Sequence, residues 1–146
     1  MPNQTPDHHH PVQIVQDILW GDMDEFGHIN NTVYFRYFED IRMIYFEKVG
    51  IMEYKQKHNI GPILANTQCQ FRIPLSYPDT ITISTSIDQV EGKRFMMEYE
   101  VYSQQHQKLA AEGNGLIIFY DYEHKKTCEV PESIKQSIDT LEQKKN

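Results

Sequence analysis

A broad apolar stripe in the first third of the chain constrains the fold most strongly. Within residues 33–49, apolar side chains recur at steps of three and four: Val33, Tyr34, Tyr37, Phe38, Ile41, Ile44, Tyr45 and Val49. This spacing predicts one amphipathic helix, with Asn30 or Asn31 as its N-cap and Gly50 as its stop. Because the stripe is broad, we expect another layer of structure to wrap around this helix.

The flanking sequence predicts strands and a second helix. A β-branched, apolar segment at 12–20 favours a first strand, and a polar connector spans 52–62. Apolar and polar residues then alternate in four more segments, which predict strands at 67–75, 81–87, 95–101 and 108–122. Short turns between these four favour an antiparallel sheet, and Pro131 opens a final amphipathic helix. The order predicts an α+β fold in which a sheet of about five strands covers one long helix.

Length and charge limit the classes of protein. The 146 residues fit one domain, which we place at residues 12–146 after a mobile tail at 1–11. The formal net charge of −7 argues against a non-specific nucleic-acid binder, because phosphate binding needs clustered Lys and Arg. The first residues resemble no signal peptide, no apolar run is long enough to span a membrane, and the two cysteines cannot form a disulfide framework. We therefore expect a cytoplasmic protein without membrane contacts.

The polar segment before the long helix carries the candidate chemistry. Asp22, Asp24 and Glu25 fall within four residues, and His28 follows four residues after Asp24. The start of a helix presents free N–H groups and the positive end of its dipole. Such N–H groups can stabilise a developing oxyanion, while a neighbouring carboxylate attacks a carbonyl or activates water.

This segment has two alternative interpretations. Acidic residues before a helix commonly cap it and complement its dipole. A calcium loop would also begin with Asp22, Asp24 and Gly27, but Phe26 and Val33 stand where such a loop needs oxygen ligands. We therefore expect no metal site.

The segment also resembles a known family. Residues 22–34 contain Asp22-x-Asp24-x-x-Gly27-His28-Ile29-Asn30-Asn31-x-x-Tyr34, and Tyr37-Phe38-Glu39-x-x-Arg42 follows. This pattern is similar to the entry of the central helix in hot-dog fold acyl-CoA thioesterases, of the 4-hydroxybenzoyl-CoA thioesterase-like family. Gln70-Phe71-Arg72-x-Pro74, followed by Asp79, resembles the second strand and turn of that family.

The resemblance implies a curved antiparallel sheet around one long helix and hydrolysis of an acyl-CoA thioester. It implies that Asp24 is the nucleophile or the general base, that a backbone N–H near Asn31 polarises the thioester carbonyl, and that His28 belongs to the site. It further implies homodimers or homotetramers with active sites between subunits. CoA then enters as part of the substrate, and no separate cofactor is expected.

The chain departs from the family pattern at several positions. Glu25 stands where some relatives have a small residue or Pro, Asn31 stands where some have His, and Phe26 stands where plant acyl-carrier-protein thioesterases have Asn. The resemblance therefore does not imply a full catalytic triad in this chain. His28 either transfers protons or orients the loop by hydrogen bonding.

Several further side chains have two possible roles. Arg72, Lys93, Arg94 and Lys108 are candidates for the phosphates of CoA, because Arg and Lys suit phosphate oxygens, although a solvated strand face is an alternative for each. Glu39 and Arg42 are spaced for an ion pair within the helix. Alternative functions are a non-catalytic module that binds acyl-CoA or another small ligand, an acyl-carrier-protein thioesterase, and a hydroxyacyl-thioester dehydratase.

Overall fold

The computed structural model describes residues 10–143 of the chain. Its elements are β1 (Val12–Asp17), a 3₁₀ turn η1 (Trp20–Asp22), α1 (Asn31–Lys48), α2 (Ile51–His58), β2 (Ile60–Phe71), β3 (Thr80–Glu91), β4 (Arg94–Ser103), β5 (Lys108–Asp121), β6 (Lys126–Thr127) and α3 (Glu132–Gln143). Most of the tail predicted at 1–11 lies outside the described residues. None of the described helices is both long enough and apolar enough to cross a membrane.

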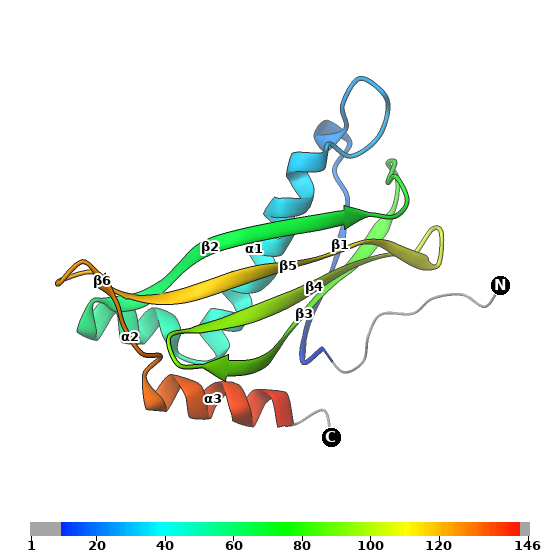
Figure 1. Cartoon of the computed structure of the whole chain (residues 1–146). Helices are drawn as coiled ribbons and strands as arrows, with labels where there is room; N and C mark the ends of the chain where they lie inside the picture. The colour runs from blue at the N-terminus through cyan, green and yellow to red at the C-terminus, as the bar shows by residue number, and fades with distance from the viewer. Residues whose placement is uncertain (1–9, 144–146) are drawn as a thin grey trace.

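The five long strands form one antiparallel sheet in the order β1-β3-β4-β5-β2. The two-residue strand β6 pairs with β5 outside this path. The sheet curves around α1, which crosses one of its faces, and α3 lies along the end where β3 turns into β4 (Figure 1). This arrangement agrees with the α+β fold expected from the sequence.

The central helix α1 begins and ends as the sequence predicts. The Asn30 side chain accepts a hydrogen bond from the Thr32 N–H at 3.0 Å, so Asn30 is the N-cap. Val49 is the C-cap, and Gly50 follows it with φ of 82°, the left-handed conformation that glycine adopts without steric cost.

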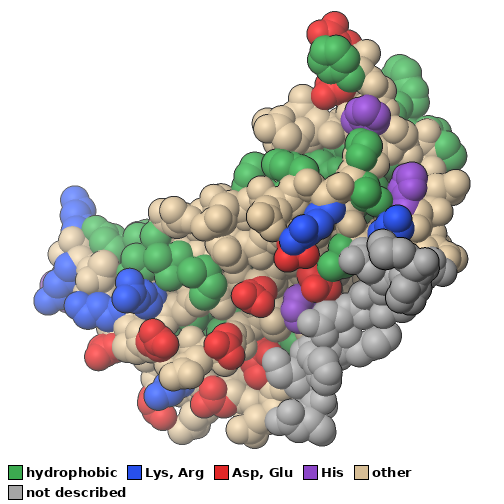
Figure 2. All heavy atoms as spheres, turned by 45° about the vertical axis from the view of Figure 1, so that its right-hand side comes forward, with side chains coloured by type: hydrophobic (Ala, Val, Ile, Leu, Met, Phe, Trp, Pro, Cys, Tyr) green, Lys and Arg blue, Asp and Glu red, His purple; other side chains and the backbone are tan. Residues whose placement is uncertain are grey.

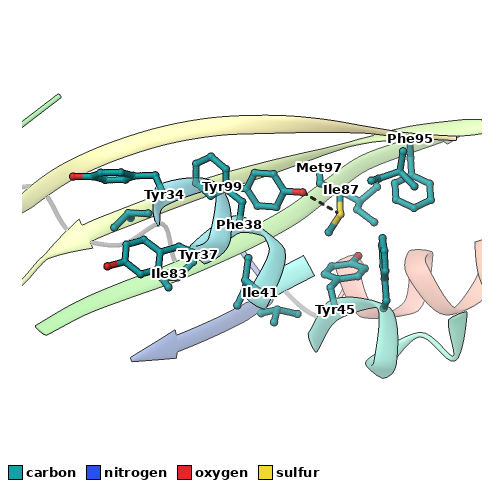
Figure 3. Packing of buried hydrophobic residues seen from close by; sticks show 14 of the residues in the cluster. Tyr34, Tyr37, Phe38, Ile41, Tyr45, Ile83, Ile87, Phe95, Met97 and Tyr99 are labelled. Atoms are coloured by element: carbon teal, nitrogen blue, oxygen red, sulfur yellow. Dashed lines mark hydrogen bonds between the residues drawn. The ribbon is translucent and has the colours of Figure 1, made fainter. Parts of the chain in front are cut away.

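The core lies between α1 and the concave face of the sheet. The apolar stripe of α1 packs against inward side chains of β3 and β4, including Ile83, Ile87, Phe95, Met97 and Tyr99 (Figure 3). The Phe38 and Tyr99 rings stack with their centroids 4.5 Å apart. Wrapping by the sheet thus explains why the apolar stripe of the helix is so broad.

The polar connector predicted at 52–62 is mostly helical. Helix α2 begins directly after Gly50 and ends at Asn59, which adopts a left-handed φ of 55°. Ile51 is its one fully buried side chain, and an exposed Glu53–Lys57 ion pair at 3.0 Å spans one turn. A single buried residue gives no periodic apolar signal, so the connector was wrongly assigned.

The C-terminal helix α3 attaches to the core through a polar contact as well as an apolar face. Ile134 and Ile138 are buried as predicted, and Glu142 is buried beside them. The Glu142 carboxylate accepts hydrogen bonds from the Tyr45 hydroxyl of α1 and the Ile87 N–H of β3. Three elements distant in the sequence are therefore joined at one carboxylate.

His10, which the sequence placed within the tail, is buried. Its Nδ1 lies 2.9 Å from the Ser84 hydroxyl of β3. Pro11 leads directly into β1. His10 therefore packs against the sheet, although it lies within the predicted tail.

Candidate active site

The acidic segment between β1 and α1 forms a small closed loop. An isolated antiparallel bridge pairs Met23 with Ile29, and the Asn30 N–H donates to the Asp22 carbonyl at 3.0 Å. Within this bridge the Asp24 N–H donates to the His28 carbonyl at 2.8 Å. The backbone thus brings Asp24, His28 and the start of α1 close together.

The turn after β2 supports this loop from the side. The Ile29 N–H donates to the Leu75 carbonyl at 2.8 Å, and the Ser76 hydroxyl donates to the Gly27 carbonyl at 2.8 Å. Gly27 has φ of 79°, which side chains with a Cβ rarely adopt. Ser76 was not among the predicted site residues, because nothing in its local sequence indicates that its partner lies 49 residues away.

The Asp24 carboxylate is held by one oxygen and open at the other. Its Oδ1 accepts a hydrogen bond from the Phe26 N–H at 2.9 Å. Among the described residues, Oδ2 has no hydrogen-bond partner. Phe26 itself is 78% exposed, and acidic and apolar side chains gather at the projecting tip (Figure 2). Phe26 therefore contributes its backbone to the site, and its side chain points away.

The first turn of α1 presents one free N–H group. Asn30 accepts the Thr32 N–H with its side chain and the Val33 N–H with its carbonyl, at 3.0 Å each. Within the described part of the chain, the Asn31 N–H has no acceptor. This donor lies at the positive end of the helix dipole and is available to an oxyanion.

Asp24, His28 and Asn31 line one open cleft with a volume of about 350 Å³. The remaining walls are Ile29, Tyr34, Phe71, Arg72, Ile73 and Pro74. The Tyr34 and Phe71 rings meet edge to face, 5.0 Å apart. Burial raises the pKa of Tyr34 to about 12, so this phenol stays neutral and cannot act as a base near neutral pH.

The candidate phosphate-binding residues are separated in the fold. Arg72 lines the cleft, and it donates to Glu112 at 3.3 Å and to Gln70 at 3.1 Å. Lys93 and Arg94 lie at the turn between β3 and β4, whereas the Asp24 loop lies near the opposite end of β3. That strand has 12 residues, which is about 40 Å. Within one chain, Lys93 and Arg94 therefore do not line the cleft.

Two motif residues have roles that the sequence did not reveal. Asp79 is buried and accepts hydrogen bonds from the Ser103 hydroxyl at 2.6 Å and the Gln105 N–H at 2.9 Å, which ties β3 to the turn after β4. Arg42 is buried and donates to the Tyr99 hydroxyl instead of pairing with Glu39, so the expected ion pair within the helix is absent among the described residues.

The described residues also include no group of three His, Cys, Asp or Glu side chains that could hold a metal ion. Cys69 packs against the core, and burial raises the pKa of its thiol to about 11. A thiolate nucleophile is therefore disfavoured at that position.

Comparison with known proteins identifies the family. The model of the thioesterase-like superfamily matches residues 18–138, which include the whole cleft. The chain belongs to this superfamily. The long-chain acyl-CoA thioesterase FadM of Escherichia coli is 19% identical over 119 residues, covering 82% of this chain and 90% of FadM.

Solved structures confirm the hot-dog fold. A thioesterase from Thermus thermophilus, solved with coenzyme A and zinc, superposes with a TM-score of 0.80 at 24% identity and covers 92% of this chain and 96% of its own. The 1,4-dihydroxy-2-naphthoyl-CoA thioesterase of Synechocystis superposes with a TM-score of 0.79 at 14% identity, covering 89% of this chain and 96% of its own. The resemblance to hot-dog thioesterases noted in the sequence is thereby confirmed.

Proposed function

We propose that this chain hydrolyses acyl-CoA thioesters. The observation that carries the proposal is the shared cleft of Asp24 and the unpaired Asn31 N–H. Membership of the thioesterase-like superfamily supports it. An anionic base and an oxyanion donor facing one cavity are the two groups that acyl transfer to water requires.

In this mechanism the thioester carbonyl oxygen accepts a hydrogen bond from the Asn31 N–H. If Asp24 is the base, its Oδ2 removes a proton from water as the water oxygen attacks the carbonyl carbon, the C–S bond then breaks, and the proton passes to the leaving CoA thiolate. If Asp24 is the nucleophile, Oδ2 attacks that carbon itself, the C–S bond breaks to leave a mixed anhydride on Asp24, and water hydrolyses the anhydride. Both routes give the carboxylic acid and the CoA thiol. The Phe26 N–H keeps the carboxylate oriented throughout. No metal or cofactor takes part.

His28 and Arg72 have supporting roles in the proposal. His28 lines the cleft at the base of the Asp24 loop, where it transfers protons or orients that loop. Arg72 is half exposed at the rim and offers N–H groups to a CoA phosphate. Lys93 and Arg94 lie at the other end of the sheet from the cleft. They would bind CoA phosphates only if the CoA lay at that end. The cytoplasmic location expected from the sequence belongs to the same proposal.

We further propose that the working form is a homodimer joined through β2, or a homotetramer built from two such dimers. Among the described strands, β2 is an edge that pairs only with β5. Leu64 and Phe71 on this strand are 43% and 50% exposed. A long unpaired edge invites pairing with another chain, and this one ends at the cleft wall. Light scattering is expected to give a mass of at least twice the chain's 17.3 kDa. A monomer at micromolar concentration would contradict this proposal.

The reaction is tested with a panel of short, medium, long and aromatic acyl-CoAs, with the released thiol followed by absorbance. Hydrolysis without added metal or cofactor is expected. If no member is hydrolysed but one raises the melting temperature, the non-catalytic binding module is favoured instead. The same acyl group is also tested on an acyl-carrier protein, to determine whether CoA or the carrier protein presents the thioester.

A further inference from the structure

Arg42 is a buried cation without a counter-ion among the described residues. It lies on α1, and only 6% of its surface is exposed. Its Nη1 donates to the Tyr99 hydroxyl at 3.0 Å. Among the described residues it has no other hydrogen bond and no carboxylate within ion-pair distance.

Such an arrangement is costly in a folded protein. Arginine is almost never buried unless it is paired, because a buried charge loses its hydration. The Tyr99 hydroxyl offers a neutral acceptor only, and it donates its own proton toward the Met97 sulfur at 3.7 Å (Figure 3). One neutral acceptor leaves most of the five guanidinium N–H groups without a partner in residues 10–143.

Arg42 lines a cavity of about 260 Å³ between α1 and β2. The other lining residues are Thr32, Phe35, Arg36, Glu39, Leu64 and Thr67. Two arginines and one glutamate give the cavity a formal charge of +1. Phe35 and Leu64 add apolar wall, so the cavity suits an anionic group at the end of an apolar chain.

The cavity lies along α1 from the proposed reaction centre. Asn31 lines the Asp24 cleft, and Thr32 and Phe35, within the next turn, line the Arg42 cavity. Both hollows are lined by residues of α1 and of β2. Asn31 and Arg42 are eleven residues apart, which corresponds to about 16 Å along the helix axis. An extended alkyl chain with C–C bonds of about 1.5 Å advances roughly 1.3 Å per carbon, so about twelve carbons span this distance.

We propose that Arg42 selects acyl groups that carry a second carboxylate at their far end, as in the CoA monothioesters of medium-chain dicarboxylic acids. This inference rests on the proposed function, since it takes the thioester carbonyl to lie at Asn31. The distal carboxylate accepts charge-assisted hydrogen bonds from the guanidinium and neutralises it. Acyl groups that end in a methyl leave the buried charge uncompensated, and a site built for hydrogen bonding discriminates strongly against such analogues.

The experiment compares dodecanedioyl-CoA with lauroyl-CoA, which differ only in the terminal group. We expect kcat/KM of the purified protein to be at least about tenfold higher for the dicarboxylic substrate, the scale of one charge-assisted hydrogen bond. In Arg42→Met the ratio of the two kcat/KM values is expected to fall by about 10- to 100-fold, mainly through KM for dodecanedioyl-CoA. Arg42→Lys keeps the charge and is expected to retain part of the preference.

The matched control is Lys48→Met, which removes a positive charge from the exposed end of the same helix. The substrate ratio should not change in this variant. Equal kcat/KM values for both substrates in the unmodified protein would overturn the inference. So would a loss of activity in Arg42→Met that is equal for both substrates and accompanied by loss of the oligomer, since Arg42 would then pair with a carboxylate of a second copy.

The two proposals fail in different ways. If neither thioester is hydrolysed, the proposed function is wrong. Both compounds then stay intact, and their binding can still be measured. Their effects on the melting temperature then decide the inference: a larger increase with dodecanedioyl-CoA, lost in Arg42→Met, supports it, and equal increases or none refute it.

Discussion

Asp24→Asn is expected to lower kcat for acyl-CoA hydrolysis by about 10²- to 10⁴-fold, the range that a positioned general base contributes. Asn retains the shape of Asp and can still accept the Phe26 N–H at its amide oxygen, so the loop should keep its conformation. The substitution removes only the anionic oxygen that takes the proton or attacks the carbonyl. KM should change little, because the carboxylate acts in the transition state.

The neighbouring residue provides a matched control for Asp24→Asn. Glu25→Gln makes the same chemical change one residue away, at an exposed side chain that does not line the cleft. We expect the kcat of Glu25→Gln to stay within a few-fold of that of the unmodified protein. The melting temperatures of the unmodified protein and both variants show whether each variant is folded. A similar small effect in Asp24→Asn would remove Asp24 from the mechanism, whether as base or as nucleophile.

The elements that could be predicted from the sequence are those with strong local signals. Helix α1 has an apolar stripe of five turns, an Asn cap and a left-handed glycine, and each agrees with the others. Strand β1 follows from its β-branched, apolar residues and the other four long strands from their period of two, although β2 begins seven residues before the bound predicted from the alternation. Helix α2 and the short β6 could not be found, because they bury little and depend on where their neighbours place them.

The same contrast holds for the candidate site. Asp24, His28 and Asn31 lie within eight residues, so a single loop brings them together and the sequence sufficed to group them. Arg72 joins them from the position directly after β2, while Lys93 and Arg94 lie at the far end of the sheet. Basic composition alone cannot distinguish these positions. The Arg42 side chain is oriented by its hydrogen bond to the Tyr99 hydroxyl, 57 residues away in the sequence. The i,i+3 spacing of Glu39 and Arg42 does not predict this orientation.

The proposed oxyanion donor is a backbone group, and one substitution can remove it. Asn31→Pro deletes the N–H at the first position of α1, where proline is tolerated because that N–H has no partner in the helix and φ already suits the ring. The preceding Asn30 has φ of −60° and ψ of 141°, an extended conformation that is compatible with a following proline. The Thr32 and Val33 N–H groups keep their bonds to Asn30, so the helix cap should survive.

We expect Asn31→Pro to lower kcat by about 10²- to 10³-fold, the cost of losing one oxyanion donor, while the melting temperature stays nearly constant. Asn31→Ala separates the backbone from the side chain, since it removes the amide group and keeps the N–H. Its kcat should lie close to that of the unmodified protein. If both variants were equally active, the thioester carbonyl would have to be polarised elsewhere, and the Thr32 and Val33 N–H groups could serve only by giving up the Asn30 cap. A large loss in Asn31→Pro alone would instead place the reacting carbonyl at the start of α1, within reach of Asp24, and thereby fix the end of the cleft from which an acyl chain runs along the helix.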